Sequence, residues 1–251
     1  MRVVAVRNPA RRAVLAPQDG RMSRDAVAAV RTGMRDLSWW VRDYAYAVRA
    51  QARAVRGRGI AASLAEGEGR PIVLLPGIYE TWRFLEPLAR VLHERGHPVH
   101  AVVELGGNRR PIAESAERVG AFLVAHDLHD VVLVAHSKGG LIGKHLMAFS
   151  PEGARVRAMV AVATPFGGSR YSRLMPTPSL RAFASGDATM RALAAAAEAN
   201  ARIVSVYGPF DPHIPEGSEL AGARNVRLAE GGHFRVLADP RVVAEVVRAA
   251  E

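Results

Sequence analysis

Strand-length apolar runs alternate with helical segments from residue 71 to the end of this 251-residue chain. The runs are apolar throughout, which is typical of strands buried on both faces. Their alternation with helices predicts an α/β fold, with a mostly parallel central sheet and helices on both faces. We expect strands at 72–77, 99–105, 131–136, 157–165, 201–209 and 225–230, and helices at 83–95, 112–127, 139–148 and from Pro240 onward.

Residues 1–70 differ from the rest of the chain in charge and in pattern. They hold 14 arginines against 6 acidic residues, whereas the other residues hold 20 basic and 18 acidic side chains. From Ser23, which can cap it, to about Arg56, we expect an amphipathic helix with one apolar stripe. We therefore divide the chain into a basic, largely helical extension (1–70) and a main domain (71–251). The stripe comprises Val27, Val30, Met34, Leu37, Val41, Tyr44, Val48 and Val55.

This stripe needs a partner, and two kinds are open. It can pack on protein, either the main domain or a second copy of the chain in a homo-oligomer, and we favour this kind of partner. Alternatively, the helix can make a peripheral membrane contact with anionic lipid, with Trp39 and Trp40 at the level of the headgroups. We do not expect nucleic acid as a partner, because the arginines lie beside an apolar stripe and no recognition motif accompanies them.

The composition excludes several classes of protein and site. Without cysteine there is no disulfide framework, no thiolate nucleophile and no cysteine-based metal site. Neither an HExxH spacing nor a G-x-x-x-x-G-K loop occurs, so we expect neither metal nor cofactor. The first apolar run breaks at Arg7-Asn8-Pro9, and no stretch reaches the roughly 18 apolar residues of a membrane span. We expect a cytoplasmic protein.

Four of the expected strands end in polar or glycine-rich segments. PGIYE follows the first strand, HSKGG the third, YGPFDPHIP the fifth and EGGHF the last. Function collects at the carboxyl ends of parallel strands, so we expect these segments to meet. They supply a serine, an acid and a histidine in the order Ser137, Asp211, His233. A serine hydroxyl needs a base to take its proton, and the base needs an acid to hold its tautomer.

The segment AHSKG resembles the G-x-S-x-G nucleophile elbow of the α/β-hydrolase fold, whose triad follows the same order. From about Pro71 to the end, the chain is similar to the bacterial lipase and esterase branch of that fold. Ala135 stands where the pattern has glycine, and Pro76 where many relatives have histidine. The resemblance implies hydrolysis of a carboxylic ester through an acyl-enzyme on Ser137. The same triad also serves thioesterases, amidases and acyltransferases, and a non-catalytic binding protein on this scaffold is a further alternative.

The resemblance also assigns roles around the triad. The backbone N–H groups of Ile78 and Lys138 are expected to form the oxyanion hole, and the side chain of Lys138 is expected to be exposed and solvated. His213 is the rival of His233 for the base. Other acids look like helix caps, namely Asp187 and Asp239.

The segment from about 166 to 200 stands where this fold carries a short helical cap over the acyl pocket. Its apolar side chains suit a moderately apolar acyl group, among them Phe166, Tyr171, Leu174, Met175, Leu180 and Phe183. His136 is expected to pack beside the elbow. The residues expected near the substrate are Gly77, Tyr79, His136, Phe166 and Met175.

Overall fold

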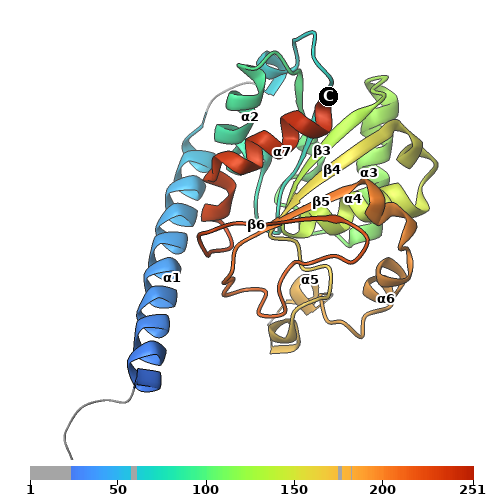
Figure 1. The fold of residues 1–251 in the computed structure, drawn as a ribbon. Helices are drawn as coiled ribbons and strands as arrows, with labels where there is room; N and C mark the ends of the chain where they lie inside the picture. The colour runs from blue at the N-terminus through green and yellow to red at the C-terminus, as the bar shows by residue number, and fades with distance from the viewer. Residues whose placement is uncertain (1–23, 58–60, 175–176, 182) are drawn as a thin grey trace, which may run out of the picture. The chain divides into compact units, whose positions relative to one another are not determined.

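Six parallel strands form the central sheet of the computed structural model, in the order β2-β1-β3-β4-β5-β6 (Figure 1). The predicted parallel sheet is confirmed, and each expected strand is present. The second is shorter than expected, because the chain turns into a 3-10 helix at Val103–Leu105. The strands are β1 (Ile72–Leu75), β2 (Val99–Ala101), β3 (Val131–His136), β4 (Val156–Val162), β5 (Ile203–Tyr207) and β6 (Arg224–Arg227).

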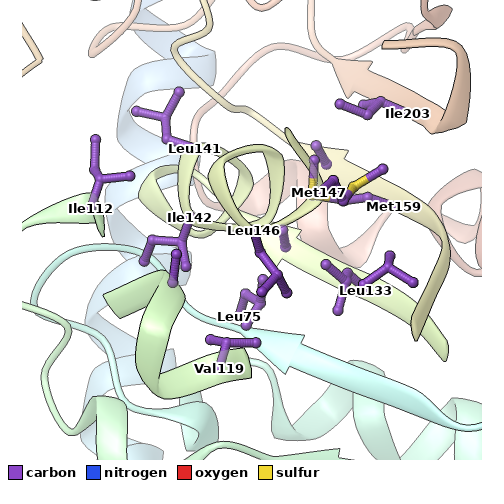
Figure 2. Close-up of a cluster of buried hydrophobic side chains, with 14 of the residues drawn as sticks. Leu75, Ile112, Val119, Leu133, Leu141, Ile142, Leu146, Met147, Met159 and Ile203 are labelled. Atoms are coloured by element: carbon purple, nitrogen blue, oxygen red, sulfur yellow. The ribbon is translucent and has the colours of Figure 1, made fainter. Parts of the chain in front are cut away.

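Helices cover both faces of this sheet (Figure 1). On one face lie α3 (Ile112–Ala125) and α4 (Lys138–Phe149), and on the other lie α2 (Glu86–His93) and α7 (Pro240–Ala250). Successive strand residues point to opposite faces, so each strand feeds two cores. Leu75 and Leu133 pack with α3 and α4 (Figure 2), whereas Leu74 and Val132 pack toward α2 and α7.

A short helical insertion connects β4 to β5. It contains the 3-10 turn Arg170–Leu174, α5 (Pro178–Arg181) and α6 (Ala188–Ala195). Asp187 caps α6 by accepting the N–H of Thr189 at 2.9 Å, and Asp239 caps α7 by accepting the N–H of Arg241 at 2.9 Å. Both predicted caps are confirmed.

The structure describes residues 24–57, 61–174, 177–181 and 183–251. Residues 24–35 are the first turns of α1 (Arg24–Arg56), and residues 36–251 form one compact unit. The expected cap Ser23 and the side chains of Val27 and Val30 lie outside the described part. None of the helices within these ranges is long and apolar enough to cross a membrane.

Within the compact unit, α1 packs on the main domain through a different face from the one we predicted. Asp43 and Ala50 are fully buried, and Tyr46 packs against the core between the sheet, α2 and α7. Of the predicted stripe, Tyr44 contacts the main domain, where its ring lies against those of His213 and Phe234; packing of the stripe on a second copy stays a prediction. The docking face is the one that carries a buried carboxylate and small side chains, which leaves the larger apolar residues in solvent. The exposed fractions are 62% for Leu37, 54% for Val41, 67% for Val48 and 78% for Val55.

Candidate active site

Ser137 lies in a sharp turn between the buried strand β3 and helix α4. Its backbone has φ 50° and ψ −117°, a left-handed conformation that costs a non-glycine residue of order 1–3 kcal/mol. Such strain persists only where the surroundings enforce it, and it clusters at functional sites. The turn therefore presents this serine at the carboxyl edge of the sheet.

The two glycines after the elbow permit a close approach of α4 to the sheet. A Cβ atom on Gly139 would lie 2.0 Å from the carbonyl oxygen of Leu75, and one on Gly140 would lie 2.1 Å from Oγ1 of Thr164. Any side chain at these positions would push the first turn of α4 away from β1 or from the end of β4. The glycines thus fix the position of the turn that carries Ser137.

Ser137, His233 and Asp211 form a continuous hydrogen-bonded chain. The Oγ of Ser137 lies 3.0 Å from Nε2 of His233, and Nδ1 of His233 donates to Oδ2 of Asp211 at 2.8 Å. The other oxygen of Asp211 accepts the N–H groups of His213 and Ile214 at 2.8 and 3.0 Å. Burial alone would raise the pKa of Asp211, but the adjacent His233 and these hydrogen bonds hold it below its ordinary value. An ionised acid therefore orients the imidazole toward the serine.

The rival base, His213, takes another place in this cluster. Its Nε2 lies 3.1 Å from the hydroxyl of Tyr44 on α1, and its ring stands 4.8 Å from that of His233. Burial and the neighbouring His233 lower the pKa of His213 to about 4, so its ring is neutral at pH 7. The structure brings His233 to the serine, and His213 contributes a backbone N–H to the acid.

Glu80 and His136 form a buried pair that sequence reasoning missed. Nδ1 of His136 lies 2.9 Å from Oε2 of Glu80, and its Nε2 lies 3.0 Å from the carbonyl oxygen of His233. A carboxylate and a carbonyl only accept, so an ionised Glu80 is matched by a proton on each ring nitrogen of His136. Burial would lower the pKa of His136, but Glu80 raises it above its ordinary value. The same Glu80 oxygen accepts the N–H of Gly77 at 2.7 Å, so the pair links the loop after β1 to the loop of His233.

The two expected oxyanion donors lie in the loop after β1 and at the start of α4. In the loop after β1, the N–H of Gly77 donates to Glu80 and that of Tyr79 to the carbonyl of Gly107 at 2.8 Å. Ile78 lies between them and lines the cavity that contains Ser137. Lys138 is the first residue of α4, where an N–H lacks a helical partner and the helix dipole favours negative charge.

The side chain of Lys138 is not solvated, and that prediction was wrong. The residue is only 2% exposed, and Nζ donates to the carbonyl oxygens of Asn108, at 2.9 Å, and Arg110. Burial lowers the pKa of Lys138 to about 8. The ammonium group holds the loop after β2 against the elbow, because carbonyl oxygens replace the water it would otherwise bind.

A cavity of about 620 Å³ opens onto Ser137 and His233. Of the residues expected at the substrate, Tyr79 lines it, whereas Phe166 lies in the core, Gly77 and His136 are buried outside the lining, and Met175 lies outside the described residues. The insertion contributes Tyr171 and Phe183. Helix α1 contributes a wall that we did not predict, made of Trp40, Tyr44, Ala47, Val48 and Gln51.

Asp43 joins α1 to the loop of the candidate base. It is fully buried, and its Oδ1 accepts the N–H groups of Phe234 at 2.8 Å and Arg235 at 2.7 Å. Gly232, with φ 134°, lets the loop come this close, since a Cβ there would lie 2.6 Å from the same oxygen. The residues directly after His233 are therefore held by a side chain from the N-terminal extension.

Among the described residues, no group of three or more histidine, aspartate or glutamate side chains is placed to hold a metal ion.

No protein-family model matches this sequence, and no curated protein sequence matches it. Solved structures do. A mature lipase from Bacillus licheniformis is 14% identical and has a TM-score of 0.59, over 73% of this chain and 91% of the lipase. An extracellular α/β-hydrolase from a Paenibacillus species is 20% identical, with a TM-score of 0.50 over 72% and 98%. A carboxylesterase from the thaumarchaeon Nitrososphaera gargenis is 11% identical, with a TM-score of 0.52 over 72% and 89%.

Proposed function

Since this chain has the α/β-hydrolase fold, we propose that it is a serine hydrolase that cleaves carboxylic esters through an acyl-enzyme on Ser137. One observation carries the proposal: Ser137, His233 and Asp211 form a hydrogen-bonded chain whose serine lies in the wall of an apolar cavity. This arrangement is the one that nucleophilic catalysis of acyl transfer requires.

In the proposed reaction, His233 takes the proton of Ser137 as its Oγ attacks the carbonyl carbon of the ester. The carbonyl oxygen becomes negative and is stabilised by the N–H groups of Ile78 and Lys138. The tetrahedral intermediate then expels the alcohol, which receives the proton from His233. Water, deprotonated by the same imidazole, attacks the acyl-enzyme and releases the carboxylic acid, which returns Ser137 to its starting state.

The cavity supports an ester with a moderately apolar acyl group. Its lining is rich in aromatic and aliphatic side chains, and its volume of about 620 Å³ is that of a small-molecule site. The structures similar to this chain include a lipase and a carboxylesterase, which act on the same kind of bond. We propose that residues 71–251 form the catalytic domain and that the extension, through α1, closes one side of its pocket.

Hydrolysis of p-nitrophenyl esters of graded chain length tests the proposal and measures the acyl preference. The Ser137→Ala protein should keep its fold and lose nearly all turnover, because the covalent intermediate cannot form. Ser115→Ala is a matched control, since Ser115 is also buried but lies on α3, outside the cavity lining. Normal turnover by a folded Ser137→Ala protein would contradict the proposal.

A further inference from the structure

Beside the face of α1 that carries Asp43 and Ala50, a row of large apolar side chains is exposed. We call it the apolar stripe of α1. It comprises the members of the predicted stripe from residue 37 onward and, in addition, Trp40. These residues are Leu37, Trp40, Val41, Tyr44, Val48 and Val55, which are between 36% and 78% exposed. An apolar band of this length on a water-exposed helix marks an interaction site. Two of its members are amphipathic rings, of the kind found at membrane–water interfaces.

A groove rich in arginine borders this stripe, between α1 and α2. It measures about 1180 Å³, and Val41 of the stripe lies in its wall, so the two surfaces are contiguous. Glu86 is the one acidic residue among the residues lining the groove, and it is paired with Arg90 at 2.6 Å. We call this surface the arginine groove; its arginines are Arg42, Arg49, Arg53, Arg56, Arg83, Arg90 and Arg235.

Three of these arginines have no acidic partner within the described part of the chain. Arg42, Arg49 and Arg56 are exposed and recur every seven residues, which places them along one side of α1. An uncompensated row of guanidinium groups attracts anions, and planar guanidinium groups bind phosphate in a bidentate manner.

The apolar stripe also reaches the candidate active site. Trp40, Tyr44 and Val48 belong both to the stripe and to the wall of the cavity that contains Ser137. One side of α1 therefore borders the mouth of the cavity and the other side borders the arginine groove. A surface bound to the stripe would lie at the entrance to the cavity.

We propose that α1 docks the protein on an anionic phospholipid surface, with the apolar stripe at the acyl boundary and the arginine groove on the headgroup phosphates. An amphipathic helix with a basic flank and aromatic rings binds such an interface through its buried apolar area and through attraction to anionic lipid. This docking goes beyond ester hydrolysis, since none of its groups takes part in the chemistry at Ser137.

A second copy of the chain is the rival occupant, and the charges disfavour it. Between residues 36 and 56, α1 carries four arginines and two acids, of which Asp43 is fully buried and Asp36 half-buried. A symmetric dimer through the stripe would bring two copies of the same basic surface together without exposed carboxylates on these helices to offset them. Phosphate headgroups supply the missing negative charge.

Flotation of the full-length protein with vesicles tests the proposal. The wild type should bind vesicles of phosphatidylglycerol and phosphatidylcholine at low salt, bind less in high salt, and bind pure phosphatidylcholine weakly. The triple variant R42Q/R49Q/R56Q should bind the anionic vesicles roughly a hundredfold more weakly, since each arginine near an anionic surface contributes about a fivefold change in affinity. The triple variant R191Q/R227Q/R248Q is the control, because it removes the same charge from exposed sites outside the groove.

A second variant tests the apolar part. L37A/V41A/V55A removes three apolar side chains of the stripe and keeps the helix, because alanine is a strong helix former. It should lower the affinity for vesicles about tenfold or more at every salt concentration. Equal losses in the two arginine variants would show that binding depends on net charge alone and would overturn the proposal. So would a wild-type protein that does not bind anionic vesicles. A dimer in solution that L37A/V41A/V55A converts to a monomer, without vesicle binding, would assign the stripe to a second copy.

Discussion

Replacing Asp43 should damage the candidate active site, although the residue lies on α1 and far from it in sequence. Its Oδ1 accepts two short N–H bonds from the residues directly after His233. Charge-assisted hydrogen bonds contribute about 1.5–3 kcal/mol each, and alanine would also leave two N–H groups without an acceptor. We therefore expect Asp43→Ala to lower the free energy of unfolding by about 3–5 kcal/mol. Loosening the loop of His233 should lower kcat/KM by about a hundredfold.

Asp43→Asn is the matched variant, because its Oδ1 can still accept both N–H groups while the charge is lost. The other carboxylate oxygen is buried without a hydrogen-bond partner among the described residues, so an amide nitrogen there gains nothing. We expect a loss of about 1–2 kcal/mol and a fall in kcat/KM of less than about tenfold. Urea unfolding and initial rates on a soluble p-nitrophenyl ester measure both quantities. Wild-type stability and kcat/KM in Asp43→Ala would refute the reasoning.

Other contacts of the site give further expectations. His233→Ala should abolish most esterase activity and His213→Ala should not; the reverse ranking in initial rates would move the base to His213. Between about pH 8 and 10.5, the unfolded chain holds the Lys138 proton and the folded protein does not. The free energy of unfolding of the wild type should therefore rise over this range by up to about 3 kcal/mol relative to that of Lys138→Met. Parallel pH profiles of the two proteins in urea unfolding would contradict this. Gly139→Ala should lower the free energy of unfolding by about 3 kcal/mol or more. Gly186→Ala should be nearly neutral, because its added methyl group meets no atom within 4 Å. Similar melting temperatures for the two variants would show that the close approach of α4 does not matter.

The sequence was informative about the sheet because the signal is local. Strands buried on both faces are apolar at every position, so a run such as 131–136 identifies itself without knowledge of its neighbours. The carboxyl ends of such strands meet at one edge, which is why segments 96 residues apart could be expected to bring Ser137 and His233 together.

The missed contacts join segments that nothing in the local sequence links. Asp43 and Glu80 look like ordinary surface acids until the fold places them against backbone N–H groups and an imidazole. The exposed apolar stripe shows the same limit. Periodicity predicts that a helix has an apolar face, but it does not say whether that face meets the core, because Asp43 and Ala50 can dock the opposite side.

The most direct test of the central claim is to trap the acyl-enzyme and locate it. A fluorophosphonate that mimics the tetrahedral intermediate should modify the wild-type protein once, and peptide mapping should find the adduct on Ser137. The modified protein should lose its esterase activity in proportion to the labelling. Full activity in a protein labelled at Ser137, or labelling of another serine with Ser137 unmodified, would contradict the assignment of the nucleophile.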